Sequence, residues 1–303
     1  MKGYRTGLAL TITLLLWASA FAGIRAGLQS FSPVHVAVFR FIVASTALAV
    51  LAMTKGIRRP TRADMPRLIL VGVIGIAVYN VVLNYGELTV KAGAASFIVN
   101  TGPMFTALLS IALLRERVQP LAWLGMIISF AGVGLIALGE SGGVELNGGA
   151  FLVLCAALCQ SLYFVLQKPL LQKYDVFTIV CYSLWIGTIS LLGFVPGLFE
   201  AIKAAPISST LAVVYLGVFP AAIGYACWSY VLSKTAASRA AAYLYLVPAI
   251  SIAIAYVWLN ELSSWVSLMG GSLALSGVLI VNIFGKQPAP SSRTIANDAA
   301  EEV

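Results

Sequence analysis

Residues 72–88 read GVIGIAVYNVVLNYGEL, and residues 217–233 read GVFPAAIGYACWSYVLS. When the two stretches are aligned without a gap, Gly72 meets Gly217 and Tyr85 meets Tyr230, at an offset of 145 residues. Both stretches are apolar and close to the length of about 20 residues that a helix needs to cross a bilayer. This alignment predicts that a membrane-crossing segment is repeated within the chain.

The repeat extends beyond these two stretches. At the front of each half, FAGIR (21–25) aligns with FVLQK (164–168) at an offset of 143. Farther along, LRERV (114–118) aligns with LNELS (259–263). A shared register across three consecutive apolar segments predicts two related units, residues 1–140 and 141–285. The offset of 145 also aligns Pro103 with Pro248, Glu116 with Glu261, Gly125 with Gly270, and Gly132 with Gly277.

The composition predicts an integral membrane protein. Of the 303 residues, 60% are hydrophobic and 10% are charged, and the mean hydropathy is +0.95, whereas soluble domains carry about 25% charged residues. The apolar runs lack the strict alternation of lipid-facing barrel strands, so they are predicted to be helices. Ten such runs are predicted to span the membrane: 7–28, 33–53, 68–88, 92–114, 121–138, 149–167, 176–199, 211–232, 236–259 and 265–284.

The positive charges predict the orientation of these ten helices. With the N-terminus inside, 15 of the 19 Lys and Arg residues fall in cytoplasmic segments and three fall at external ends, as the positive-inside rule requires. We therefore expect a multi-pass protein of the inner (plasma) membrane with both termini in the cytoplasm. The tail, residues 286–303, is polar and is predicted to be disordered. Topology explains the net charge of +8, and no basic and aromatic patch suggests nucleic acid.

Five helices per half is an odd number, so the second half enters the membrane from the opposite side. Inverted repeats of this kind are typical of secondary transporters, with a substrate site near the midplane between the halves. The fold class expected is thus all-α, with ten transmembrane helices in two inverted five-helix repeats. The partners expected are the lipid bilayer and a small-molecule substrate.

Several of these residues resemble a known family. The segment WASAFAGIR (17–25), the pair Arg40–Phe41, the repeated Pro103 and Pro248, and the LRERV and LNELS segments resemble the drug/metabolite transporter superfamily, EamA type. The resemblance covers about residues 5–285. It implies a ten-helix exporter of small metabolites, often amino acids or their derivatives.

Polar and aromatic residues at repeat-matched positions predict the lining of a cavity. Asn80, Asn84 and Glu87 lie at i, i+4 and i+7, on one helical face, and the repeat places Tyr225 and Ser229 opposite the two amides. Trp17 likewise falls opposite Gln160, and Ala20 opposite Tyr163. Contacts between helices are the alternative role for each polar residue. The residues predicted to bind substrate are Trp17, Asn80, Asn84, Asn100, Tyr163, Tyr225, Ser229 and Tyr245.

The stretch SFIVNTGPMFTALL (96–109) interrupts an apolar run with four poor helix-interior residues. Pro103 and its counterpart Pro248 are predicted to break their helices, mainly for structural reasons, with Asn100 and Tyr245 beside them as substrate-facing residues. Arg40, within a span, has two alternatives: its side chain reaches the outer surface, or it pairs with Glu87 as a gate or coupling site.

Alternatives to a transporter rest on few residues. GESGG (139–143) matches the G-x-S-x-G pattern, and Ser141 with His35 could form an intramembrane protease dyad, but the pattern requires a strand-to-helix turn. Neither a metal-ligand cluster nor a cofactor motif is found in the sequence. We expect a secondary carrier that works by alternating access, with proton coupling through Glu87 or facilitated diffusion as alternatives.

Overall fold

The computed structural model describes residues 2–90, 95, 98–141, 148–248, 250 and 265–284. In these residues the regular structure is entirely helical, in agreement with the all-α expectation. Six helices are long and apolar enough to cross a membrane: Tyr4–Leu28, Pro33–Thr54, Arg62–Gly86, Gly148–Lys173, Val176–Phe194 and Ile207–Lys234. Shorter apolar helices cover Gly102–Leu114, Pro120–Leu135 and Met269–Val281. The predicted spans 92–114 and 236–259 lie partly outside the described residues, and Glu261 and the tail 286–303 lie wholly outside them.

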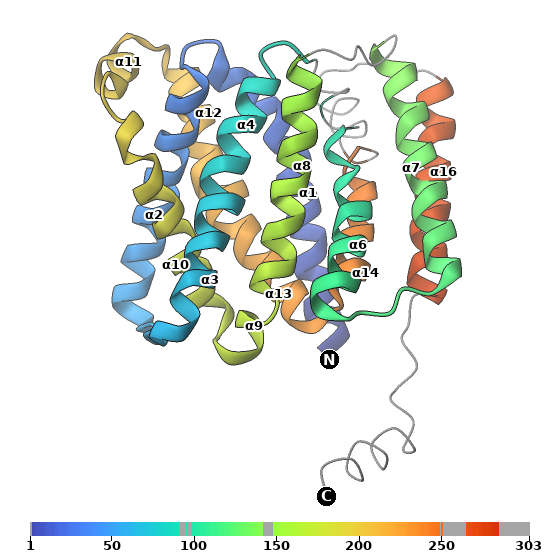
Figure 1. Ribbon diagram of the computed structural model, residues 1–303. Coiled ribbons are helices and arrows are strands. Elements are labelled where there is room, and N and C mark those ends of the chain that lie inside the picture. The colour runs from blue at the N-terminus through green and yellow to red at the C-terminus, as the bar shows by residue number, and fades with distance from the viewer. Residues whose placement is uncertain are drawn as a thin grey trace, which may run out of the picture.

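The helices of the first half follow one another up and down the bundle (Figure 1). We use "lower end" for the end at which α1 begins in Figure 1 and "upper end" for the opposite end. The elements are α1 (Lys2–Leu28), α2 (Pro33–Lys55), η1 (Arg62–Asp64), α3 (Met65–Gly72), η2 (Val73–Val78), α4 (Tyr79–Gly86), α6 (Gly102–Leu114) and α7 (Pro120–Ser141).

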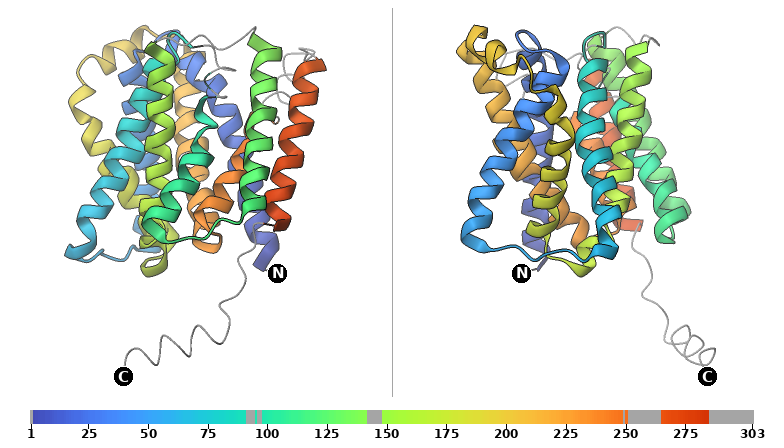
Figure 2. Two further views of the ribbon diagram at one scale, coloured as in Figure 1. Left: turned by 45° about the vertical axis from the view of Figure 1, so that its right-hand side comes forward. Right: turned by 60° about the vertical axis from the view of Figure 1, so that its left-hand side comes forward.

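The second half begins at the upper end with α8 and finishes at the lower end with α16 (Figures 1 and 2). Its elements are α8 (Gly148–Gln167), α9 (Leu170–Lys173), α10 (Val176–Leu191), η3 (Leu192–Phe194), α11 (Leu198–Ala204), α12 (Ile207–Leu216), η4 (Gly217–Gly224), α13 (Tyr225–Lys234), α14 (Ala237–Ala242), η5 (Tyr243–Tyr245) and α16 (Trp265–Phe284).

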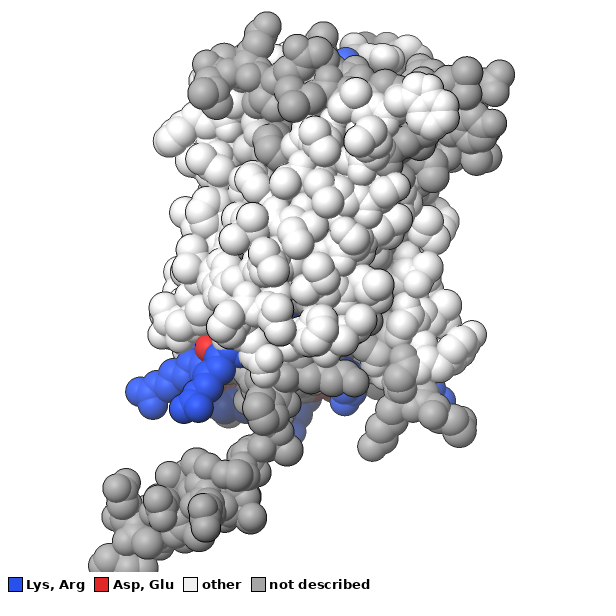
Figure 3. All heavy atoms as spheres, turned by 90° about the vertical axis from the view of Figure 1, so that its right-hand side faces the viewer, with Lys and Arg blue, Asp and Glu red and all other residues white. Residues whose placement is uncertain are grey.

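The side wall of the bundle is apolar. Figure 3 shows one face whose described surface carries almost no Lys, Arg, Asp or Glu between its two ends, while Lys and Arg gather at the lower end. Exposed apolar side chains such as Leu121, Leu124 and Ile127 are 45–53% accessible. Such a wall suits hydrocarbon, where a charged side chain is costly.

The predicted spans 68–88 and 211–232 are not continuous α-helices. Each contains a π-helical segment, η2 between α3 and α4, and η4 between α12 and α13. The offset of 145 residues maps η2 onto residues 218–223, which lie within η4. π-Helical turns are rare and are frequent at functional sites. Neither segment was predicted from the sequence.

The chain turns just before Pro103: residues 98–99 are helical, residues 100–101 form a turn, and the next helix follows. α6 begins at Gly102, and Pro103 lies in its first turn, where the missing N–H group costs nothing. The Gly102 carbonyl accepts a hydrogen bond of 2.9 Å from the Ser161 hydroxyl group of α8. In the second half, the 3₁₀ segment η5 (Tyr243–Tyr245) comes before Pro248.

Close helix contacts occur in pairs. Gly125 of α7 faces the Gly277 carbonyl of α16, and Gly132 faces the Gly270 carbonyl, so that an added Cβ atom would lie 2.7 and 2.6 Å from these oxygens. Between the two contacts, the Ser129 hydroxyl group donates a hydrogen bond of 3.0 Å to the Ala274 carbonyl. α7 and α16 therefore pack with their backbones in close contact.

A second pair of contacts joins the two halves elsewhere. A Cβ atom on Gly72 would lie 2.7 Å from Ile186 Cβ, and one on Gly217 would lie 2.8 Å from Val43 Cβ. Gly217 is 145 residues from Gly72, and Ile186 is 143 residues from Val43. The contact of α10 with the first-half segment α3–η2 thus has a counterpart in the contact of α2 with η4.

Candidate functional site

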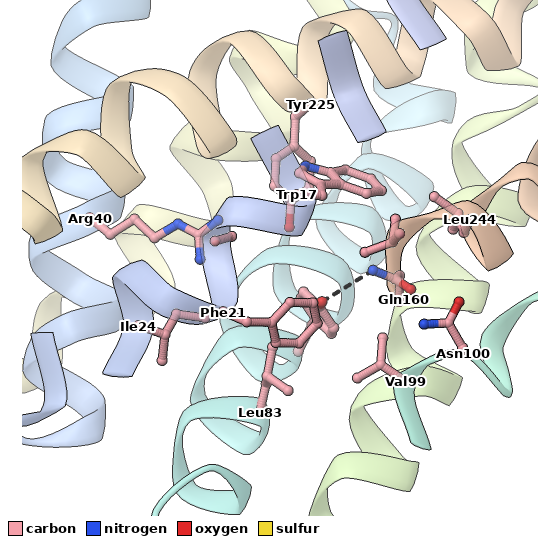
Figure 4. Close-up of a pocket in the computed structure, with 13 residues that line it drawn as sticks. Trp17, Phe21, Ile24, Arg40, Leu83, Val99, Asn100, Gln160, Tyr225 and Leu244 are labelled. Atoms are coloured by element: carbon pink, nitrogen blue, oxygen red, sulfur yellow. Dashed lines mark hydrogen bonds between the residues drawn. The ribbon is translucent and has the colours of Figure 1, made fainter. Parts of the chain in front are cut away.

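A cavity lies inside the bundle, between α1, α2, α4, α8, α13, η5 and the segments before α6 and after η5 (Figure 4). It contains about 590 Å³ of space not occupied by atoms, a volume that includes its open mouth. Its α1 residues come from the second half of that helix, toward the upper end. The lining consists of Trp17, Ala20, Phe21, Ile24, Arg40, Tyr79, Leu83, Val99, Asn100, Gln160, Tyr225, Leu244 and Val247.

Hydrogen bonds fix three polar side chains of this wall. Arg40 donates from Nη1 to Asn80 Oδ1 at 3.0 Å. Gln160 donates from Nε2 to the Tyr79 hydroxyl group at 3.1 Å, the bond drawn in Figure 4. Trp17 donates from its indole nitrogen to the Pro220 carbonyl at 3.3 Å. Pro220 lies inside η4, so the π-helical segment supplies an acceptor that positions a cavity side chain.

An aromatic cluster borders the cavity on the side of the lower end. It contains Trp17, Phe41, Tyr163, Phe164, Tyr225 and Trp228, whose ring centroids lie 4.6–6.4 Å apart. Phe164 and Trp228 follow Gln160 and Tyr225 on helices that run toward the lower end. Trp228 is fully buried and Phe164 is 1% exposed. This cluster separates the cavity from the lower end.

At the lower end, two charged side chains bind the segment that runs from the end of α13 to the start of α14. Glu116 accepts hydrogen bonds from the N–H groups of Ala237 and Ser238, at 2.9 and 3.2 Å. Lys168 donates to the carbonyl groups of Leu232 and Thr235. The Glu116 bonds join the residues after α6 to the second half of the chain, and the Lys168 bonds join the end of α8 to α13 within that half. We refer to them as the lower latch.

The structure brings four of the predicted site residues to the cavity: Trp17, Arg40, Asn100 and Tyr225. Asn80 lies behind Arg40, to which it is bonded. Asn84 is 1% exposed and donates to the Pro33 carbonyl at 2.9 Å, a contact between α4 and the start of α2. Asn84 therefore serves helix packing in this conformation.

The remaining predicted residues also lie outside the lining. Tyr163 belongs to the aromatic cluster, and Ser229 donates to Gln167 Oε1 at 3.0 Å. Tyr245 is fully buried in an apolar cluster with Met126 and Val278, of α7 and α16. In its place, Leu244 and Val247 face the cavity.

Arg40 and Glu87 do not form an ion pair. Arg40 is 5% exposed and is bonded to Asn80, so it does not reach the surface either. Glu87 is 7% exposed, and neither of its carboxylate oxygens has a hydrogen-bond partner among the described residues. Within that part of the chain, the one ion pair is Lys173–Asp64, 2.9 Å apart at the lower end.

Most of the apolar lining was not predicted from the sequence. Phe21, Ile24, Leu83, Val99 and Val247 are ordinary apolar residues in apolar spans, and no pattern distinguishes them from lipid-facing ones. Gln160 did carry a signal, because it is the repeat counterpart of Trp17. Both residues of that matched pair line the cavity.

Nothing among the described side chains supports the protease dyad of Ser141 and His35. Ser141 is the last residue of α7, and its side chain is outside the described set. The His35 ring lies 3.2 Å from the Pro196 carbonyl oxygen. Among the residues that the structure describes, no group of three His, Cys, Asp or Glu side chains could hold a metal ion.

A helical bundle with an apolar side wall and an internal cavity of mixed polarity is the architecture of a membrane transporter. The sequence matches the EamA-like transporter family over residues 5–138 and 147–283. The chain belongs to this family.

Two relatives extend the comparison. The "Uncharacterized transporter YdfC" of Bacillus subtilis is 43% identical over 263 residues, 87% of this chain and 86% of the relative. The "Probable terminal-alkyne amino-acid exporter" of Streptantibioticus cattleyicolor is 37% identical over 282 residues, 93% of this chain and 95% of the relative. A solved crystal structure, 18% identical, shares the fold with a TM-score of 0.75 and covers 92% of this chain.

Proposed function

We propose that this protein is a secondary transporter that exports small amphipathic metabolites, amino acids or their derivatives, by alternating access. The observation that carries the proposal is the cavity: polar groups of Arg40, Asn100 and Gln160 face apolar side chains such as Phe21 and Leu244. Such a lining suits a molecule with one polar end and one apolar end. The name of the Streptantibioticus relative, an amino-acid exporter, agrees with this class.

Alternating access requires two halves that can exchange their arrangements. Paired contacts support two inverted five-helix repeats, residues 1–140 and 141–285. Gly125 faces Gly277 while Gly132 faces Gly270, and each glycine in these contacts is the counterpart of a glycine in the other. Such reciprocal contacts are the signature of a two-fold relation. The family match, in two segments of similar length, agrees with this division.

The described conformation corresponds to a state closed toward the lower end. The aromatic cluster and the lower latch lie between the cavity and that end. We assign the lower end to the cytoplasm of a cell whose inner membrane holds the protein, because the basic links lie there. These links carry Arg58, Arg59 and Arg62 between α2 and α3, and Arg115 and Arg117 between α6 and α7.

Transport into proteoliposomes tests the proposal. A panel of labelled amino acids, including a terminal-alkyne amino acid, is offered to the purified protein with and without a pH gradient. Ala20 lines the cavity, whereas Ala22 is exposed on the side wall. Ala20→Trp should fill the cavity and abolish uptake, and Ala22→Trp should leave it intact. Equal activity of the two variants would mean that substrate does not pass through this cavity. The protease alternative has no observation in its favour.

A further inference from the structure

We propose that Arg40 is the carboxylate-binding residue of the cavity, and that the site selects molecules with one carboxylate and a large apolar remainder. This inference rests on the proposed transport function and names the substrate class of the same cavity. Figure 4 shows the guanidinium group of Arg40 directed from α2 toward Tyr225 and Trp17. The group thus faces the space in which a ligand would lie.

The charge of Arg40 is costly to bury. Its guanidinium group keeps its charge in a protein, and a buried charge needs a partner of opposite sign or several hydrogen bonds. In the described residues, Arg40 has the Asn80 amide oxygen at 3.0 Å and the Phe41 ring centroid at 5.3 Å, and its Nε atom has no hydrogen-bond partner. No acidic side chain of those residues lies within ion-pair distance. The positive charge of Arg40 therefore has no anionic partner among the described residues.

The Asn80 side chain holds Arg40 in a fixed orientation. Asn80 accepts from Arg40 through Oδ1 and donates from Nδ2 to the Ile76 carbonyl at 2.8 Å. Ile76 lies in the π-helical segment η2. A side chain oriented by a buried amide, itself oriented by the backbone, is a positioned donor. Its remaining N–H groups can bind a carboxylate in the two-pronged geometry that guanidinium groups favour.

The rest of the cavity lining is mostly apolar. None of the described lining residues is Asp or Glu, so none of them offsets the charge of a cationic side chain on a ligand. Apolar side chains from α1, α4 and the segment after η5 cover the side away from Arg40, among them Phe21, Leu83 and Val247. A neutral amino acid with an apolar side chain fits this wall. Lysine or arginine would place a cation beside Arg40 or against apolar groups.

Binding of four matched probes tests the inference: L-leucine, L-leucinamide, 4-methylpentanoate and 3-methylbutylamine. The first and third carry a carboxylate, and the other two lack it. A ligand that binds the folded state raises its unfolding temperature, so thermal unfolding of the detergent-purified protein reports binding without transport. We expect both carboxylates to bind at least about tenfold more tightly than the amide or the amine, as a charge-assisted contact predicts.

The Arg40 variants separate a ligand contact from a structural role. Arg40→Gln should remove the tenfold preference for leucine over leucinamide, and Arg40→Lys should retain part of it. Lys203→Gln removes an exposed cation of α11 at the upper end and should leave the preference unchanged. If Arg40→Gln does not fold, the ratio in Arg40→Lys decides.

Two results would overturn the inference: a wild-type protein that binds leucinamide as tightly as leucine, or an Arg40 variant that keeps the full preference. Failure of the transport proposal looks different. In that case leucine would bind with the carboxylate preference, but no member of the labelled panel would cross the proteoliposome membrane.

Discussion

One carboxylate oxygen of Glu116 accepts two hydrogen bonds from Ser238, one of 2.7 Å from the hydroxyl group and one of 3.2 Å from the main-chain N–H group. The two residues are separated by 122 positions in the sequence and belong to different halves. Hydrogen bonds to charged groups contribute about 1.5–3 kcal/mol each. If the lower end opens during transport, these bonds must break in each cycle.

Removing this carboxylate should therefore favour the state open at the lower end. In a background without native cysteines, we expect Glu116→Ala to increase the labelling rate of Ser229→Cys by roughly tenfold. Ser229 is fully buried below the cavity, so a polar maleimide reaches it only when the lower end opens. Glu200→Ala, on α11 at the upper end, is the control. An unchanged labelling rate would show that Glu116 only caps α14.

Asn100 and Pro103 are three residues apart and should behave differently when replaced. Asn100 lines the cavity, whereas Pro103 is buried in the first turn of α6. Asn100→Leu removes a polar contact at similar volume, and we expect roughly two- to tenfold weaker substrate binding with normal insertion. Pro103→Ala should change the transport rate more than the affinity. Unchanged affinity in Asn100→Leu would assign that residue to helix packing.

Glu87 is the buried acid available for proton coupling in the described residues near the cavity. A carboxyl group with no hydrogen-bond partner there can bind or release a proton as its surroundings change. We expect Glu87→Gln to abolish stimulation of transport by a pH gradient while substrate exchange continues. The measurement is uptake with and without the gradient, beside exchange in the same vesicles. A gradient dependence that survives the substitution would favour facilitated diffusion.

The backbone contact between α7 and α16 leaves no room for a side chain at Gly132. An added Cβ atom would lie 2.4 Å from the Ala274 nitrogen. Overpacking of this kind typically costs about 1–3 kcal/mol, so Gly132→Ala should lower the thermal stability of the purified protein. Gly7 of α1 has no heavy atom within 4 Å of such a Cβ position. Gly7→Ala should leave the stability unchanged or raise it slightly, and equal effects of the two substitutions would contradict this account.

Topology is testable without any structural variant. Single cysteines at residues 60 and 290 should react with an impermeant reagent added from the inside. A single cysteine at residue 143 should react with the reagent added from the outside. This pattern follows from ten spans with both termini in the cytoplasm. Any other pattern of labelling would rule out the inverted repeat.

The helical class of the fold was predictable because bilayer-length apolar runs leave few alternatives. The site was predictable only in part. Trp17 and Gln160 carried a signal through the repeat, and both line the cavity. Asn84 looked equally suitable, but its partner is the Pro33 carbonyl on another helix. Packing between distant segments decides whether a polar side chain faces a cavity or a neighbouring helix. The periodicity of the sequence does not report that packing.

The π-helical segments lie directly before two tyrosines of the cavity, Tyr79 after η2 and Tyr225 after η4. A π turn contains more residues than an α turn, so each segment fits extra residues into the helix. Winding the same six residues, 73–78, as α-helix would rotate everything beyond by about 100°, one residue's share of an α-helical turn. The tyrosine would then leave the cavity lining with the backbone hydrogen bonds still made. Deleting one residue from 73–78 would instead let the segment wind as α-helix and leave the tyrosine in place. The shape of the cavity is thus set partly by how this stretch is wound, and a change of winding would reshape the lining without any change of side chain.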